Sequence, residues 1–113
     1  MSDQVLTPIV PCNDLAVSKA FYIKLGFTVY HESAEYIIFG HANGAALHLT
    51  QAAEGWLVPG RNPFGMYLYV ENVDELASVV GVKGEDKPWG MYEAAVSDPD
   101  ETLIRIGWPT SKR

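Results

Sequence analysis

The sequence has one cysteine, few basic residues and no long apolar run, and each scarcity excludes a class of protein. Cys12 has no second cysteine with which to pair, which is typical of a protein of the reducing cytoplasm. Eight Lys and Arg against fourteen Asp and Glu give a net charge of -6, which argues against nucleic acid and anionic lipid because both bind basic surfaces. No apolar segment approaches the ~20 residues that span a membrane, and the N-terminus has no signal-peptide pattern. We therefore expect a cytoplasmic protein without nucleic-acid or membrane partners.

What is present is the composition of one small globular domain. A chain of 113 residues suffices for a single modest core. Apolar residues make up 48% and charged residues 19%, a balance that excludes a disordered chain. The acidity weakly favours a cationic partner through long-range attraction, although solubility is the simpler explanation of an acidic chain.

Strand and helix patterns occur in the same order in the two halves of the chain. The first half predicts a strand, a helix and three strands, at residues 5–11, 15–25, 27–31, 36–39 and 45–50. The second half predicts a strand, a short helix and two further strands, at residues 65–70, about 74–80, 91–96 and 102–108. Residues 10–18 and 70–78 also share Val, Asp and Ser at a constant offset. We therefore predict a single α+β domain, 1–113, built from two βαβββ modules at about 4–51 and 62–110.

Local signals mark the ends of these elements. Asn13-Asp14 can cap the first helix, and Gly26 follows its last residue. Asn43-Gly44 predicts a hairpin turn, because this pair accepts positive φ at little cost.

Alternation along three strands separates an apolar face from an aromatic and polar face. The residues expected beneath the helices are uniformly apolar: Leu47, Leu49, Met66, Leu68, Val70, Ile104 and Ile106. The residues between them are different: Ala46, His48, Thr50, Tyr67, Tyr69, Leu103 and Arg105. Cross-strand tyrosine pairs on a partly exposed sheet explain each tyrosine alone equally well. The agreement of three strands, however, favours a surface that binds a ligand.

Three segments resemble the glyoxalase, bleomycin-resistance and extradiol-dioxygenase superfamily, also called vicinal oxygen chelate proteins: NDLAVSKAFYIKLGF, NVDEL and KPWGMYEAAVSDPD. The resemblance extends over nearly the whole chain, in order and with suitable spacing. It implies paired βαβββ modules that curve into a mixed-sheet cradle, in a homodimer whose N-terminal strands are exchanged about Pro8. Glu101 stands where the family usually has glycine in a turn, so a positive φ there would cost roughly 1 kcal/mol.

The positions that hold a metal in other members of this superfamily correspond to Thr7, His48, Gly65 and Arg105. Only His48 is a credible ligand, because Gly65 has no side chain and Arg105 is a fixed cation that repels a divalent ion. Catalytic zinc or non-haem iron needs about three protein ligands. We therefore expect no metal, no cofactor and no catalytic residue.

The resemblance is closest to the metal-free bleomycin-resistance proteins, which bind the drug and need no catalytic group. It implies a groove between two subunits that holds a flat aromatic, cationic ligand such as a bleomycin-like glycopeptide. Aromatic side chains suit such a ligand through stacking and cation–π contact. The predicted ligand-binding residues are Tyr67, Tyr69, Trp89, His48, Arg105, Phe39 and Trp56.

Arg105 leaves two alternatives open. It places a positive charge in a cradle meant for a cation, unless Glu93, Glu71 or Asp98 neutralises it. It could instead anchor the carboxylate or phosphate of another metabolite. A glyoxalase- or dioxygenase-like enzyme of the same fold is the second alternative, and it would require a metal held by His48 with Glu71 or Glu93.

Overall fold

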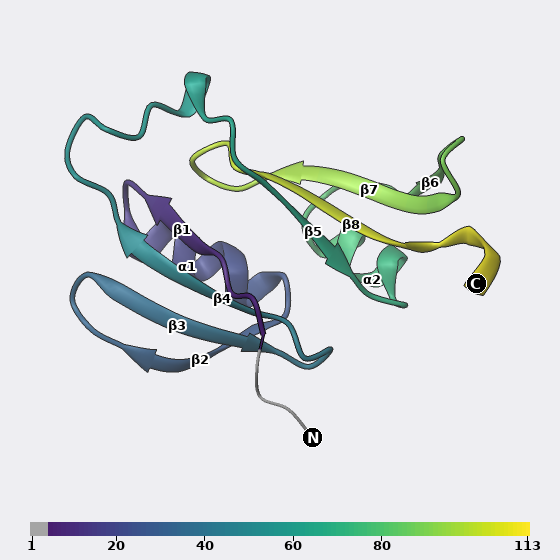
Figure 1. The fold of residues 1–113 in the computed structure, drawn as a ribbon, viewed down its shortest axis with the longest axis horizontal. Coiled ribbons are helices and arrows are strands. Elements are labelled where there is room, and N and C mark those ends of the chain that lie inside the picture. The colour runs from purple at the N-terminus through teal and green to yellow at the C-terminus, as the bar shows by residue number, and fades with distance from the viewer. Residues whose placement is uncertain (1–4) are drawn as a thin grey trace.

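Two mixed four-stranded sheets, each with one helix, make up the computed structural model, which describes residues 5–113 (Figure 1). The first module contains β1 (Ile9–Cys12), α1 (Leu15–Lys24), β2 (Phe27–Glu32), β3 (Tyr36–His41) and β4 (Ala46–Gln51). The second contains β5 (Gly65–Tyr69), α2 (Val73–Val79), β6 (Glu85–Asp86), β7 (Met91–Ser97) and β8 (Leu103–Pro109). Two short 3-10 turns are formed by Pro59–Arg61 and Thr110–Lys112. This order confirms the predicted α+β fold of two βαβββ modules; the predicted start of the first module, at about residue 4, lies outside the described residues.

Strand pairing follows the same plan in both sheets. The strand orders are β1-β4-β3-β2 and β5-β8-β7-β6. The first strand of each module runs parallel to the last, and the other pairs are antiparallel. The sequence pattern does not predict β6, because its two residues are too few to show alternation. Its pairing with β7 defines it, with Glu85 opposite Glu93 and Asp86 opposite Tyr92.

Helix α1 begins and ends where the local signals indicate. The Asp14 carboxylate accepts hydrogen bonds from the backbone N–H groups of Ala16 and Val17 at 3.1 and 3.2 Å, which is the geometry of an N-cap. Gly26, with a φ of 106°, follows the helix at a conformation that favours glycine. Asn13 does not cap the helix; it donates to the Asp100 carboxylate across the molecule. No helix among residues 5–113 is long and apolar enough to cross a membrane.

The core lies beneath the two helices, on the face that alternation assigned to it. Six of the seven residues predicted for this face are buried, and Met66 packs against them from a partly buried position. Phe39 is also fully buried, so the prediction that it reaches the ligand groove is wrong. The reason is strand register: Phe39 lies opposite Leu47 and therefore shares its face, where its ring packs near those of Tyr22 and Phe27.

A buried polar cluster joins the two modules at the turn between β7 and β8. The Asp98 carboxylate accepts from the Tyr22 hydroxyl of α1 at 2.7 Å and from the backbone N–H groups of Asp100 and Thr102 at 2.8 and 2.9 Å. Burial, followed by the negative charge of Asp98, raises the pKa of Tyr22 well above its usual range, so this hydroxyl stays a donor. Glu101 has a φ of 64°, which confirms that this turn requires the left-handed conformation.

Candidate ligand-binding site

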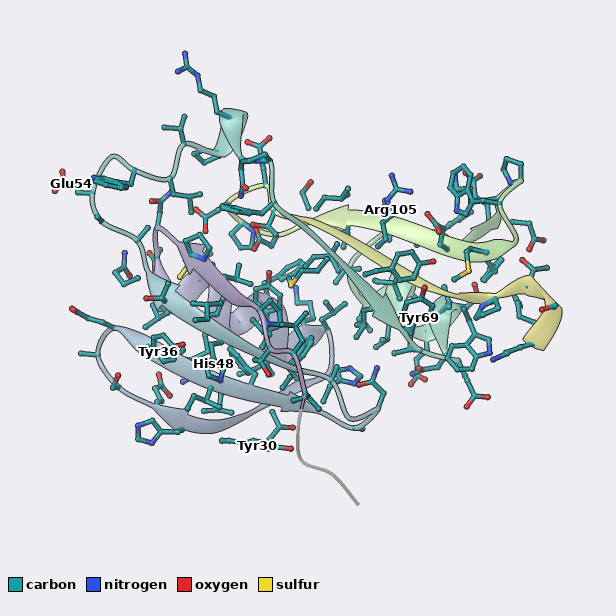
Figure 2. All side chains as sticks on the ribbon, in the orientation of Figure 1. Tyr30, Tyr36, His48, Glu54, Tyr69 and Arg105 are labelled. Atoms are coloured by element: carbon teal, nitrogen blue, oxygen red, sulfur yellow. The ribbon has the colours of Figure 1, made fainter. Side chains whose placement is uncertain are left out.

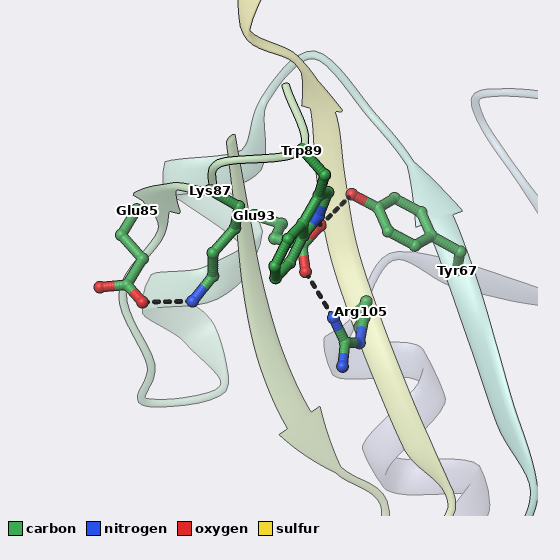
Figure 3. A network of polar contacts seen from close by, with 6 residues as sticks. All are labelled: Tyr67, Glu85, Lys87, Trp89, Glu93 and Arg105. Atoms are coloured by element: carbon green, nitrogen blue, oxygen red, sulfur yellow. Dashed lines mark hydrogen bonds and ion pairs between the residues drawn. The ribbon is translucent and has the colours of Figure 1, made fainter. Parts of the chain in front are cut away.

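Glu93 is the centre of a polar network in the second sheet (Figure 3). Strand pairing places it on the face opposite to that of the core residue Ile106, which we call the open face. Its Oε1 atom accepts hydrogen bonds from the Tyr67 hydroxyl at 2.8 Å and from the Trp89 indole N–H at 3.2 Å. Its Oε2 atom accepts from Nη1 of Arg105 at 2.9 Å. The structure therefore brings together three of the predicted ligand-binding residues, Tyr67, Trp89 and Arg105, around one carboxylate.

The carboxylate of Glu93 is 2% exposed, yet its environment favours the charged form. Burial raises the pKa of Glu93, but the hydrogen bonds from Tyr67, Trp89 and Arg105, together with the positive charge of Arg105, outweigh burial and leave that pKa lowered. Burial also raises the pKa of Tyr67, as do its hydrogen bond to Glu93 and the charge of Glu93. The site thus holds an ionised carboxylate against a neutral phenol, and Glu93 neutralises the charge that Arg105 brings into the sheet face.

Gly107 makes room for this network. It lies opposite Glu93 in β7 and opposite Tyr69 in β5, between the two strands that the network joins. A Cβ atom at Gly107 would lie 2.0 Å from Tyr67 Oη and 3.0 Å from Cβ of Glu93, so a side chain there would displace the phenol. Of the three carboxylates that the sequence offered to neutralise Arg105, Glu93 is the one that pairs with it. Sequence reasoning did not place Glu93 at the centre of the site and missed Gly107. A glycine inside a strand does indicate a close approach, and that signal could have identified Gly107.

Two aromatic rings and a hollow flank the network. The rings of Tyr67 and Tyr69 lie 4.6 Å apart between centroids and are tilted by 37°. The side chain of Asn43, in the turn between β3 and β4, donates to the carbonyl of Tyr69 at 2.7 Å and so ties the first module to the end of β5. Trp89 is 58% exposed and borders a hollow of about 250 Å³, which Lys83, Glu85, Lys87, Glu93, Ala94, Ala95 and Arg105 also line.

The other predicted site residues lie elsewhere. His48 lies in β4 on the first sheet, with its Nδ1 atom 2.6 Å from the hydroxyl of Tyr36, apart from Tyr69 and Arg105 on the second sheet (Figure 2). Trp56 is 86% exposed in the loop between β4 and the turn at Pro59–Arg61. Pro8 precedes β1, and its carbonyl accepts from the backbone N–H of His48 at 3.0 Å, so β1 pairs with β4 of its own chain here.

An apolar cavity lies between the two modules. It has a volume of about 400 Å³ and is lined from the first module by Pro8, Ala46 and Leu47 and from the second by Met66 and Tyr67, among others. Tyr67 therefore borders this cavity while its hydroxyl reaches Glu93 on the open face. One tyrosine connects the apolar and the polar parts of the site.

Similarity to known proteins agrees with this geometry. No family model matches the chain. A bleomycin resistance protein from Klebsiella pneumoniae is 30% identical over 120 residues, which cover 94% of this chain and 92% of the relative. The chain belongs to the bleomycin-resistance protein family.

Solved structures of this family have the same fold. A bleomycin-binding protein complexed with bleomycin superposes with a TM-score of 0.78 at 27% identity, over 95% of this chain and 98% of that chain. A bleomycin resistance determinant encoded on the transposon Tn5 gives a TM-score of 0.79 at 27% identity, over 96% and 98% of the two chains. Lactoylglutathione lyase from Agrobacterium tumefaciens shares the fold alone, with a TM-score of 0.73 at 17% identity over 97% and 96%. The resemblance inferred from the sequence, to the superfamily and within it to the bleomycin-resistance proteins, is confirmed.

The residues at the superfamily's metal positions do not fit a metal ion. Within residues 5–113, no group of three or more His, Cys, Asp or Glu side chains lies close enough together to hold one. Gly65 offers no side-chain donor atom, and the guanidinium of Arg105 is engaged by Glu93. His48 is the single remaining ligand type at these positions, and its Nδ1 atom already bonds to Tyr36. The chemistry of these side chains therefore does not support a metal-dependent step at these positions.

Proposed function

We propose that this protein binds a flat aromatic, cationic drug of the bleomycin type and acts by sequestration, without chemical change to the ligand. The observation that supports this best is the grouping of Tyr67, Tyr69 and Trp89 on one sheet face beside a hollow. Aromatic faces gain from stacking on planar rings and from contact with cations. We further propose that it acts in the cytoplasm, because Cys12 has no partner cysteine in the sequence.

The charge at the site is compatible with a cationic ligand. Arg105 is paired with Glu93, so a cation that enters does not meet an unpaired guanidinium. Lys87 is likewise paired with Glu85 at the edge of the hollow. The net charge of -6 attracts cations over a longer range. These two pairs offset two of the three positive charges that line the hollow, Lys83 being the third, and the acidity of the rest of the chain acts in the same direction.

We also propose that two copies form a homodimer with a ligand groove between them and N-terminal strands exchanged about Pro8. β1 and β5 are edge strands of their sheets, which leaves backbone groups free for a second chain. Leu6 is 97% exposed, and Ile9, Phe64 and Leu103 are also exposed near these strands. Apolar side chains gathered at open edges favour association with a second copy.

Sedimentation equilibrium tests the dimer. The wild-type protein should have twice the mass of the chain, and Leu6→Glu should lower that mass by placing a charge in the interface. Val17→Glu is the matched control, because Val17 is an exposed apolar residue of α1. A monomeric wild type, or equal dissociation of the two variants, would refute the proposed interface.

A bleomycin titration followed by tryptophan and tyrosine fluorescence tests ligand binding. We expect quenching with micromolar or tighter affinity at about one ligand per groove. Tyr67→Ala and Trp89→Ala should each weaken binding by at least about tenfold, as expected for aromatic residues that contribute most of the binding energy. Tyr30→Ala is the control, because this exposed tyrosine lies on β2 of the other sheet. Absence of quenching at millimolar drug would refute the proposed function.

A further inference from the structure

The position of Glu93 is unusual for a buried carboxylate. It faces the open side of the sheet, opposite Gly107, whereas its neighbour Ala94 lies opposite Ile106 of the core. A charge withdrawn from water is tolerated when its oxygens are fully bonded. Three donors achieve this here, and all three belong to side chains of the ligand-binding face. The carboxylate therefore organises that face and takes no part in the apolar core.

We propose that Glu93 is the positioning and specificity-determining residue of this site: it holds Trp89 and Tyr67 in place and offsets the charge of Arg105, so that the site admits a cation that an unpaired Arg105 would repel. This inference rests on the proposed function, because it describes how the same site selects its ligand. It assigns to Glu93 two separable effects, one through geometry and one through charge.

The geometric effect concerns the polar ends of the two rings. Trp89 is 58% exposed and lies next to Gly90 in the turn before β7, so the bond from its indole N–H to Glu93 limits its rotation. The hydroxyl of Tyr67 passes over Gly107, where a Cβ atom would block it, to reach the same oxygen. The hydroxyl of Tyr67 and the indole N–H of Trp89 both donate to Oε1 of Glu93, and this shared acceptor sets the orientation of one ring relative to the other.

The charge effect follows from the different solvent exposure of the two carboxylates at the hollow, Glu85 and Glu93. Lys83, Lys87 and Arg105 supply three positive charges, against Glu85 and Glu93. The side chain of Glu85 is 69% exposed and that of Glu93 is 2% exposed. Solvent and salt therefore screen Glu85 strongly and Glu93 weakly. Loss of the Glu93 charge would leave Arg105 unpaired beside Trp89 and would raise the sum of these charges from +1 (three against two) to +2 (three against one), which shifts the preference of the hollow toward anions.

The test uses two probes that differ only in the terminal group and therefore in its charge: bleomycin with a cationic terminal amine, and the corresponding terminal carboxylic acid. Affinities for both are measured by titration with the wild type and with Glu93→Gln, which keeps the shape and removes the charge. We expect Glu93→Gln to lower the ratio of cationic to anionic affinity by about tenfold or more, as like charges at close range disfavour binding. The matched control Glu85→Gln removes the same charge from the exposed side of the hollow and should change the ratio by less than about threefold.

A shorter side chain separates the geometric effect from the charge effect. Glu93→Asp keeps the negative charge but draws the carboxylate back from Trp89 and Tyr67. It should weaken both probes by similar factors and leave their ratio unchanged. The double variant Glu93→Gln with Arg105→Gln should restore the wild-type ratio, because both charges of the pair are then absent. If Glu93→Gln and Glu85→Gln shift the ratio equally, or if the double variant fails to restore it, the assignment of charge selection to Glu93 is overturned.

A measurement without ligand tests the anchoring of Trp89 independently of drug binding. The indole N–H resonance of Trp89, assigned with Trp89→Phe, should move upfield in Glu93→Gln, because the bond to a charged oxygen is weakened. An unmoved resonance would overturn the positioning role. If the wild type binds neither probe, the proposed function fails and charge selection fails with it, while this resonance still decides whether Glu93 holds the indole.

Discussion

Replacement of Gly107 by alanine should destabilise the protein, because the new methyl group would overlap the side chain of Tyr67. The new Cβ would lie 2.0 Å from Tyr67 Oη, 2.8 Å from Tyr67 Cζ and 3.0 Å from Cβ of Glu93. Contacts this short are not tolerated, and the far end of the tyrosine is the part that can move. The phenol must swing away, and its hydrogen bond to Glu93 is then lost.

The expected change in the free energy of unfolding is the difference between a lost hydrogen bond and a gain from the alanine side chain. Loss of a hydrogen bond to a charged group costs about 1.5–3 kcal/mol. Alanine in a strand recovers about 0.5–1 kcal/mol relative to glycine, because it loses less conformational freedom on folding. We therefore expect Gly107→Ala to lower the free energy of unfolding by about 0.5–2.5 kcal/mol, measured by urea denaturation.

Gly65 provides a matched control on the neighbouring strand. A Cβ atom there would lie no closer than 3.5 Å, to the carbonyl oxygen of Leu103, which is an ordinary contact. Gly65→Ala should thus leave the free energy of unfolding unchanged or raise it by up to about 1 kcal/mol. In a Tyr67→Phe background, which lacks the hydroxyl, the cost of Gly107→Ala should decrease. Equal stability of the two alanine variants would refute the reasoning.

Three further changes test other parts of the structure. Tyr22→Phe should lower the free energy of unfolding by about 1.5–3 kcal/mol in urea denaturation, because the buried carboxylate of Asp98 loses a donor. No loss of stability would contradict the role of that bond. Glu101→Gly should raise the melting temperature, since glycine relieves a strain of roughly 1 kcal/mol at a φ of 64°; a lower value would count against strain in this turn. The lowered pKa of Glu93 means that its ionised form stabilises the fold above the ordinary carboxyl range, and that this stabilisation is lost as pH falls through the lowered value. The stability difference between the wild type and Glu93→Gln should therefore be largest near neutral pH and should disappear on acidification, and a difference independent of pH would exclude this linkage.

Patterns among residues that are close in the sequence were sufficient to predict the helices, the turns and which residues of a strand share a face of the sheet. Asp14 caps α1 as predicted, and Glu101 adopts the positive φ expected of its turn. Alternation placed Leu47, Leu68 and Ile104 in the core without knowledge of their partners. These features depend on local geometry, because the interactions that produce them are made between residues close together in the sequence.

Alternation alone does not say which face of a strand is buried or which residues of neighbouring strands meet; the register between strands decides both. Phe39 is one of the predicted ligand-binding residues, and only its pairing with Leu47 shows that it belongs to the core. The two-residue strand β6 exists through its partner β7. Glu93 and Gly107 become parts of the site because β5, β7 and β8 align them with Tyr67.

The family, the doubled βαβββ order, the aromatic character of one sheet face and the poor fit of Gly65 and Arg105 to a metal all follow from the order of residues along the chain. The convergence of Tyr67, Trp89 and Arg105 on one buried carboxylate follows only from the folded structure. Tyr67 and Arg105 are distant from Glu93 in the chain, and strand pairing brings them together with it. A shift of one residue in any strand would turn its side chains to the other face.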